Sequence, residues 1–449
     1  MGSSPLTDNA LESRWKTTFR ALRHRNFQLF FSGQVISLVG TWMQNVAQAW
    51  MVYDMTHSSV RLGEVSFASQ IPVFLFAPIG GMAADRYNRH RMVIGAQVSS
   101  MILALILGVL KLTGVIQVWH IFVLSSLLGI VNAFDIPARQ SFMVEMVGRE
   151  DLMNAIALNS SMFNGARVAG PAIAGILLGA IGEGWCFIAN GISYIAVIIG
   201  LLMMKVQSSG RKVSESSPTE HIIEGFRFVR TAIPIRDILL LLGVISLVAM
   251  PYAVLMPIFA DHILHGGARG LGILMGATGL GALLAALTLA ARSGLKGLGR
   301  FPAWAACGFG LSLIAFGLSR NFWLSVALLV PVGYGMMLET TSSNTLIQAM
   351  VPDELRGRVL AVYTMMFMGM APLGSLLAGL LADRIGAPKT LSLGGIAAIL
   401  AGALFLTRLS EFRAGARSLV MAQGLAGGDP PQEIITDGAT APPFSENAD

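Results

Sequence analysis

Charged residues are scarce in this chain of 449 residues, in which Asp, Glu, Lys and Arg together account for 12%. That share is about half of what soluble domains carry, whereas hydrophobic residues reach 54%. The composition excludes an ordinary water-soluble enzyme, a disordered chain and a collagen-like chain. Because a membrane-spanning helix needs roughly 20 apolar residues, we expect a protein that lies almost entirely within a lipid bilayer.

Cysteine is rare, and the motifs of common enzyme classes are missing. Cys186 and Cys307 lie in separate apolar runs without a CxxC pattern, so neither a disulfide framework nor a metal site is expected. The sequence contains no HExxH, GxSxG or Walker-type phosphate-binding motif, and its 7 histidines fall in loops or at the ends of apolar runs. We therefore expect no catalytic residue, no metal, no cofactor and no direct use of ATP.

Long apolar runs predict an all-α membrane protein with twelve transmembrane helices. The expected spans are residues 27–52, 62–84, 93–114, 117–138, 157–180, 185–206, 237–261, 270–292, 301–319, 322–346, 358–382 and 389–408. A polar stretch separates the first six from the last six. The expected parts are a cytoplasmic N-terminal segment (1–26), a six-helix bundle (27–206), a cytoplasmic linker (207–236), a second six-helix bundle (237–408) and a disordered cytoplasmic tail (409–449).

The basic residues are distributed unevenly between the predicted loops. Of 31 Lys and Arg residues, 24 fall on the side of the two termini, 6 fall on the other side, and Arg167 lies within a span. Since basic residues flank spans on the cytoplasmic side, we expect both termini to be cytoplasmic and the chain to cross the plasma (cell inner) membrane several times. The same distribution accounts for the net charge of +6 without a nucleic-acid partner.

The two halves of the sequence contain a repeat at an offset of 204 residues. Residues 147–182 and 351–386 align without gaps, and glycines coincide at four positions, including Gly170 with Gly374. In the same register, Asp135 corresponds to Glu339. The repeat predicts two pseudo-symmetric six-helix bundles, an architecture in which transporters bind a substrate between the halves and expose it to each side in turn.

A short loop between the second and third predicted spans reads GGMAADRYNRHR over residues 80–91. It resembles the signature loop of the major facilitator superfamily, G-x-x-x-D-R-x-x-R-x-R. Its carboxylate and arginines suit a loop that gates the pathway between the halves, and a simple orientation signal is the other interpretation. The expected gating residues are Gly81, Asp85, Arg86, Arg89 and Arg91.

Further segments resemble the enterobactin-exporter-like branch of that superfamily. They read DIPARQ (135–140), NAIALN (154–159), ARVAGPAIAG (166–175) and VPDELRGRV (351–359), and the resemblance covers roughly residues 15–410. It implies a monomeric secondary active transporter that exports small amphipathic, siderophore- or drug-like molecules by alternating access, with protons as the coupling ion in an antiport. Uptake, lipid translocation, or a non-transporting receptor or scaffold on the same fold are the alternatives. In one departure, Ser125 stands four residues before Gly129, where the drug-antiporter pattern has an arginine.

Polar residues recur along one face of the first predicted span. Gln34, Thr41, Asn45 and Gln48, together with Ser37, follow one another at steps of three or four residues, which places them on the same side of a helix. Polar groups in spans usually face a cavity or a partner helix. We expect the stripe to line the substrate cavity, and hydrogen bonding within the first bundle is the other interpretation.

Arg167 is the only basic residue expected deep within a span. An unpaired guanidinium in hydrocarbon costs several kcal/mol, so it needs a carboxylate, an anionic substrate or a water-filled cavity. Its candidate ion-pair and coupling partners are Asp54, Glu64, Asp135 and Glu339. Asn164 shares its helix face, and Tyr334 and Tyr363 are further candidates for the cavity wall.

Overall fold

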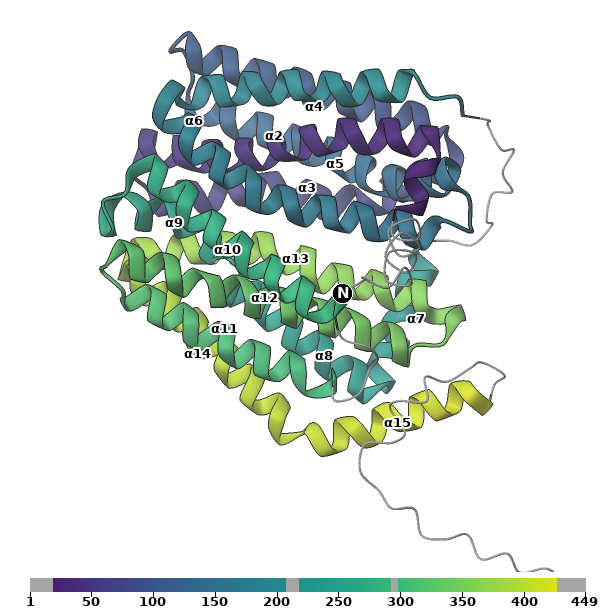
Figure 1. The fold of residues 1–449 in the computed structure, drawn as a ribbon. Helices are drawn as coiled ribbons and strands as arrows, with labels where there is room; N and C mark the ends of the chain where they lie inside the picture. The colour runs from purple at the N-terminus through teal and green to yellow at the C-terminus, as the bar shows by residue number, and fades with distance from the viewer. Residues whose placement is uncertain (1–18, 207–217, 292–297, 426–449) are drawn as a thin grey trace, which may run out of the picture.

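The computed structural model describes residues 19–206, 218–291 and 298–425, and every element in these ranges is a helix (Figure 1). The first half contains the short η1 (Arg20–Arg23) and then α2 (Arg25–Thr56), α3 (Ser59–Arg86), α4 (Arg89–Leu112), α5 (Val118–Val147) and α6 (Leu152–Leu202). The linker contains α7 (Pro218–Thr231). The second half consists of α8 (Ile233–Val244), η2 (Ile245–Ala249), α9 (Tyr252–Ile258), η3 (Phe259–Ile263), α10 (Gly267–Ala290), η4 (Leu298–Arg300), α11 (Phe301–Leu318), α12 (Phe322–Met350), α13 (Asp353–Ile385) and α14 (Ala387–Thr407), followed by α15 (Leu409–Leu425).

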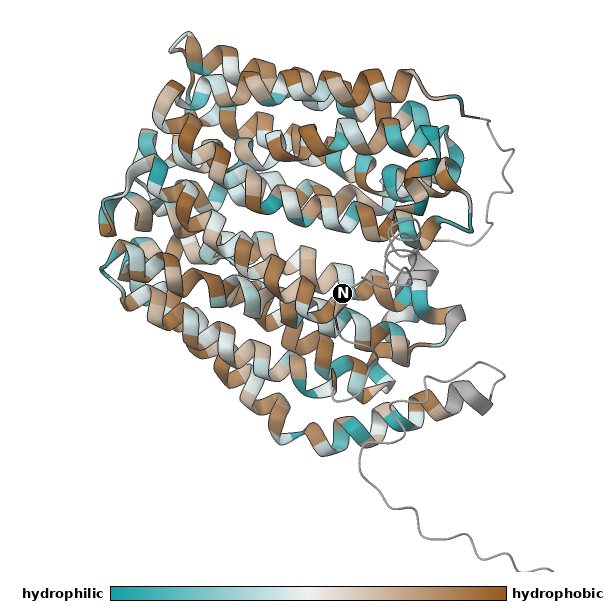
Figure 2. Cartoon of the chain, viewed as in Figure 1, coloured by the Kyte–Doolittle hydropathy of each residue, from teal (hydrophilic) through white to brown (hydrophobic). Residues whose placement is uncertain are grey.

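Ten helical segments in the described part of the chain are long and apolar enough to cross a membrane. Large apolar side chains also lie on the outer surface, including Leu75 at 58% exposure and Leu400 at 64%. In Figure 2, hydrophobic residues run along the length of the helices, and hydrophilic residues gather at their two ends. A water-soluble protein rarely exposes so much apolar surface, so the expectation of a multi-pass, all-helical membrane protein is confirmed.

Helix α6 contains two of the predicted spans in one element. Its 51 residues would extend about 77 Å at the helical rise, far more than a bilayer core of about 30 Å. The chain turns back at Gly182, whose φ of 79° is outside the helical range and suits glycine because it lacks a Cβ atom. The predicted boundary between spans at 180–185 coincides with this turn.

Helix α2 is not among the ten membrane segments, although its 32 residues make it long enough. The polar stripe predicted from the sequence lowers its mean hydropathy. The helix nevertheless packs along α6 over much of its length, and Gly33 permits close contact, because a Cβ atom there would lie 2.8 Å from the Cα atom of Val197. A helix with polar side chains can thus lie within the membrane when neighbouring helices cover those side chains.

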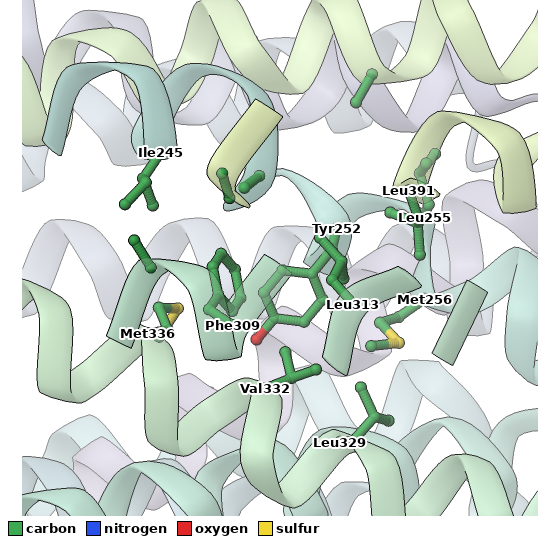
Figure 3. Close-up of a cluster of buried hydrophobic side chains, with 14 of the residues drawn as sticks. Ile245, Tyr252, Leu255, Met256, Phe309, Leu313, Leu329, Val332, Met336 and Leu391 are labelled. Carbon is green, nitrogen blue, oxygen red and sulfur yellow. The ribbon is translucent and has the colours of Figure 1, made fainter. Parts of the chain in front are cut away.

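Within each half, the helices pack mainly on one another. Helices α2, α3, α4 and α5 pack with one another and with α6, while α10, α11, α12 and α14 form the corresponding group in the second half (Figure 1). Figure 3 shows part of the second group's core, where Tyr252 of α9 lies beside Phe309 of α11 with ring centroids 6.0 Å apart. The halves contact each other chiefly through α3 with α13 and α6 with α10.

Helices α7 and α15 lie at the same end of the molecule as η1 (Figure 1), and we call this end the terminal face and the other the opposite face. Helix α15 differs from the expectation of a tail disordered from residue 409. Its residues Phe412, Ala416 and Val420 recur every four positions and are buried, because this side of the helix packs against α8, α12 and η4. The rest of that tail, 426–449, lies outside the described residues, as do 1–18 of the N-terminal segment and 207–217 of the linker.

The N-terminal η1 is held against the start of α6. Asp151 pairs with Arg20 and accepts a 2.7 Å hydrogen bond from the His24 ring, and the Ala21 amide donates to Asn154. The hydrogen bond from His24, together with the Arg20 guanidinium, keeps the pKa of Asp151 below its ordinary value. Residues 20–24, which directly precede the first long helix, are therefore fixed to the terminal face of the first half.

Near the opposite face, the two halves meet backbone to backbone at four glycines, which we call the glycine seam. Gly63 of α3 faces Gly379 of α13, and Gly175 of α6 faces Gly272 of α10. A Cβ atom at Gly63 would lie 2.7 Å from the Ser375 carbonyl oxygen, and one at Gly175 would lie 2.9 Å from the Cα atom of Gly272. Small residues at these positions let the helices approach closely.

Towards the terminal face, glycines on three of these four helices no longer touch the other half. A Cβ atom added at Gly81 of α3, Gly165 of α6 or Gly357 of α13 would meet no neighbouring atom within 4 Å. Between the two ends, Gly279 of α10 still presses on α6, where a Cβ atom would lie 2.8 Å from the Arg167 carbonyl oxygen. The halves are thus closed at the opposite face and diverge from Arg167 towards the terminal face.

Candidate functional site between the halves

Arg167 lies at the point on α6 where contact with the second half ends. Its Nη2 atom approaches the Met336 sulfur of α12 at 3.8 Å, so the side chain reaches across the boundary between the halves. On the other side, its guanidinium carbon lies 5.7 Å from the ring centroid of Trp42 of α2. A guanidinium over an indole face gains a cation–π attraction that strengthens when water is excluded.

Tyr252 completes the surroundings of this guanidinium. Its side chain is 4% exposed, it lies close enough to Arg167 for an electrostatic interaction, and Figure 3 shows Tyr252 and Met336 in one buried cluster. Trp42 also makes an edge-on contact with Phe163, at 5.7 Å between centroids. We refer to Arg167, Trp42, Tyr252 and Met336 as the Arg167 site.

None of the four acids considered as partners forms an ion pair with Arg167 among the described residues. Glu64 pairs with Arg61 at 2.7 Å, and Asp135 pairs with Arg139 at 3.5 Å. The Glu339 carboxyl accepts a hydrogen bond from Ser343, and Asp54 is exposed at the end of α2. The guanidinium is therefore stabilised by an aromatic face and a thioether, with its positive charge left unneutralised.

The side chains of the polar stripe on α2 have different surroundings: some form hydrogen bonds within the first half, and one is exposed. Gln48 donates a 2.9 Å hydrogen bond to Ser125 of α5, and Thr41 lies 3.4 Å from the Tyr194 hydroxyl of α6, so both bond within the first half. Gln34 is buried, and its Oε1 atom has no hydrogen-bond partner. Asn45 is the exposed member of the stripe.

Asn164, Tyr363 and Tyr334 were also predicted to line the substrate cavity, and the first two donate hydrogen bonds to backbone carbonyls of helices. Asn164 is partly exposed one turn before Arg167 and donates to the Ser160 carbonyl at 2.9 Å. Tyr363 of α13 donates to the Thr340 carbonyl of α12 at 3.0 Å. Tyr334 is partly buried against a small cluster of α10, α11 and α12 that contains Ala285, Ala305 and Leu338, so it belongs to the second half's packing.

The signature loop is organised around Arg89, whose side chain is 4% exposed. It donates to the Ala84 and Ser141 carbonyls at 2.9 and 3.2 Å and pairs with Glu145 at 3.1 Å and Asp85 at 3.3 Å. All these partners belong to the first half, so Arg89 ties the α3–α4 connection to α5. Asp85 is 65% exposed, Arg86 and Arg91 are exposed, and Gly81 faces open space.

Replacing Arg89 with alanine is expected to destabilise the first half. The substitution removes four acceptor contacts and leaves two carboxylates without their cation, which costs about 2–3 kcal/mol. Thermal unfolding of the purified protein in detergent should show a lower apparent Tm. Arg91→Ala, at an exposed position two residues away, is the matched control, and an equal Tm for both variants would contradict this role for Arg89.

Sequence reasoning missed three members of the Arg167 site. Trp42, Tyr252 and Met336 resemble ordinary core residues, and Trp42 in particular lies off the polar stripe. One signal was available for Trp42: Gly170 lies three residues after Arg167 on α6, and a Cβ atom there would collide with the Trp42 side chain. A glycine that permits close approach thus marks where the indole meets α6.

A separate cavity of about 850 Å³ opens on the opposite face. It is lined by the end of α2, the end of η3, the α11–α12 connection and the α13–α14 connection, with Tyr53, Asp261, Arg320 and Asp383 among its residues. No member of the Arg167 site lines it. The cavity therefore belongs to the closed end of the boundary between the halves.

Comparison with known proteins agrees with the membrane architecture. A family model described as transmembrane secretion effector matches residues 16–423. The staphyloferrin A transporter of Staphylococcus aureus (strain NCTC 8325 / PS 47) is 29% identical over 373 residues, which are 82% of this chain and 93% of that protein. The enterobactin exporter EntS of Escherichia coli O1:K1 / APEC is 26% identical over 390 residues, which cover 87% of this chain and 93% of EntS.

Solved structures show the same fold at much lower identity. A POT family transporter in complex with 5-aminolevulinic acid superposes with a TM-score of 0.68. The two sequences are 11% identical, and the match covers 86% of this chain and 96% of that chain. The likeness concerns the fold alone. Because the matching proteins are transporters, the expectation that this chain is not an enzyme is confirmed.

Proposed function

The chain belongs to the transmembrane secretion effector family of the major facilitator superfamily, and on this basis we propose that it exports small anionic, siderophore-like molecules across the inner membrane. The single observation that supports an anionic substrate is the Arg167 guanidinium, which lies unneutralised where the two halves diverge. Guanidinium groups bind carboxylates and similar anions through paired hydrogen bonds. Trp42 and Met336 add apolar contact for an amphipathic molecule.

The proposed architecture has twelve crossings in two six-helix bundles. Ten come from the apolar segments, the turn at Gly182 divides α6 into two crossings, and α2 supplies the twelfth. The excess of basic residues on the terminal face supports a cytoplasmic position for that face and for both termini. In this orientation the halves diverge towards the cytoplasm and are closed outside, the arrangement in which an exporter receives its substrate.

Export then requires the two halves to rock about the bound molecule. Closure at the terminal face brings the signature loop, with Asp85, Arg86 and Arg91, towards the second half, while the glycine seam opens at the opposite face. The exposed Asn45 of α2 and the partly exposed Asn164, one turn before Arg167 on α6, are proposed to line the substrate path. Proton antiport, which the resemblance to the exporter branch implies, is the proposed driving force, and the sequence contains no phosphate-binding motif that would indicate direct use of ATP.

Transport in proteoliposomes tests this function. The purified protein is reconstituted with an imposed pH gradient, and staphyloferrin A and enterobactin are the siderophore probes. Ethidium tests transport of a cation, and a lysolipid tests transport of a lipid. We expect saturable, gradient-dependent flux of at least one siderophore and none of ethidium. Flux of the lysolipid alone would favour the lipid alternative, flux without dependence on the pH gradient would remove the antiport, and no flux under any gradient would favour a receptor or scaffold.

A further inference from the structure

Two buried acids occupy matching positions in the two repeats. Asp135 of α5 and Glu339 of α12 lie 204 residues apart, the offset of the repeat, and each lies 17 residues after the first residue of its helix. Both are enclosed by their own half, with Asp135 at 5% and Glu339 at 0% exposure. A carboxyl group at this depth is costly unless it is paired or protonated.

The two acids differ in the residue one helical turn further on. In α5 that residue is Arg139, which pairs with Asp135 Oδ2 at 3.5 Å, while Gln97 donates to Oδ1 at 3.3 Å. In α12 the corresponding residue is Ser343, whose hydroxyl lies 3.1 Å from Glu339 Oε1. The other oxygen of Glu339, Oε2, is buried without a hydrogen-bond partner. The repeat thus contains one acid with a cation and one without.

Among the residues that the structure describes, the Glu339 carboxyl has its hydrogen bond with Ser343, and none of the ion pairs joins it to a cation of a neighbouring helix. Helix α11 contains no charged residue, and the single one of α10, Arg269, lies near the opposite face. At the start of α8, Asp237 lies 3.6 Å from Arg236 and 4.0 Å from Arg408, and Arg358 of α13 pairs with Glu224 at 2.5 Å. The titratable group facing Glu339 is Tyr363 of α13, whose hydroxyl donates to the Thr340 carbonyl instead.

We propose that Glu339 is the residue that binds the exchanged proton, an inference that rests on the antiport proposed above. An ionised carboxylate without a cation or a full set of donors costs several kcal/mol in this environment, so the carboxyl group holds a proton while it is enclosed. When rocking of the halves hydrates it, the O–H bond breaks, the proton passes to water and the carboxylate remains. Asp135 stays ionised beside Arg139 and takes no part in the exchange.

Glu339→Gln tests the proposal, because it keeps the shape and polarity of the protonated acid but removes the exchangeable proton. In proteoliposomes with labelled staphyloferrin A or enterobactin, the variant should lose pH-gradient-driven accumulation by about tenfold or more, the effect of 1.4 kcal/mol. Counterflow of the same probe at equal pH should remain, since it needs no net proton movement. Glu339→Asp should restore part of the driven transport, and Thr345→Ala, at an exposed position of the same helix, is the matched control that should keep the wild-type level.

A second measurement does not depend on the substrate. Infrared difference spectra of the reconstituted wild-type protein between two pH values should contain the carbonyl stretch of a protonated carboxylic acid, and this band should be absent from Glu339→Gln. Gradient-driven transport by Glu339→Gln at the wild-type level would overturn the proposal, as would loss of both driven transport and counterflow in a variant with an unchanged Tm. Wild-type flux that does not depend on the pH gradient would instead overturn the antiport. The infrared band would still show whether Glu339 is protonated.

Discussion

Replacing Arg167 with alanine is expected to weaken binding of the transported anion by about 30-fold or more and to abolish its export. The estimate follows from the loss of about 2–5 kcal/mol when one member of a buried, hydrogen-bonded charge pair is removed. Because no carboxylate in the described part of the chain neutralises the guanidinium, the substitution removes a substrate contact without leaving an acid unpaired. Isothermal calorimetry with the detergent-solubilised protein measures the affinity, and proteoliposome flux measures export.

The controls separate charge from bidentate recognition. Arg167→Lys keeps the charge but not the planar set of donors, so its affinity should fall between wild type and Arg167→Ala. Arg61→Ala removes an exposed arginine that pairs with Glu64 near the opposite face and should leave both measurements unchanged. An Arg167→Ala variant with wild-type affinity and export would show that the guanidinium serves packing between the halves and not the substrate.

Replacing Gly272 with leucine is expected to open the opposite face. A Cβ atom at this position would lie 2.7 Å from the Pro171 carbonyl oxygen and still closer to the backbone of Gly175, and neither backbone has room to move within its helix. Overpacking of this kind costs about 1–3 kcal/mol, and the cost applies only while the seam is closed. A two-state equilibrium should therefore shift by about 5- to 150-fold towards the open seam.

Distances between spin labels can follow this shift. Labels at positions 61 and 384, on α3 and α13 near the opposite face, should move apart in Gly272→Leu in a background where Cys186 and Cys307 are replaced by alanine. Gly165→Leu is the matched control, because a side chain at that glycine of α6 meets open space. Unchanged label distances in Gly272→Leu, or an equal shift in Gly165→Leu, would contradict the role of the seam.

The positions of the helices were predictable because hydrocarbon thickness dictates the length of an apolar run. The turn at Gly182 follows from the same rule, since the preceding and following runs each reach the length of a bilayer. Helix α15 was not predicted, because it is too polar to indicate a membrane span, and it buries Phe412, Ala416 and Val420 only against the surfaces of α8, α12 and η4. Polar residues on α2 were predicted, but which of them is exposed, as Asn45 is, and which is hydrogen-bonded, as Gln48 is, depends on the neighbour that lies beside each turn.

The site was partly visible in the sequence for a related reason. An arginine in an apolar run is conspicuous because of its solvation cost, so Arg167 could be identified alone, and the repeat offset linked Asp135 with Glu339. The ion pair of Asp135 with Arg139 has the spacing of one helical turn and could have been predicted from that spacing. Trp42, Tyr252 and Met336 could not be assigned, because an aromatic or thioether side chain that faces a charge has the same sequence pattern as one that faces a core.

The glycine seam also has an entropic consequence. A contact made by long side chains immobilises several rotatable bonds each time it forms, at a cost of up to about 2 kcal/mol for each side chain. Gly63, Gly379, Gly175 and Gly272 have no rotamers to lose, and the partners a Cβ atom would meet at Gly63 and Gly175 are backbone atoms already fixed in helices. Closing the opposite face therefore costs almost no side-chain order, so in the proposed transport cycle the halves would separate and rejoin with little change in side-chain entropy.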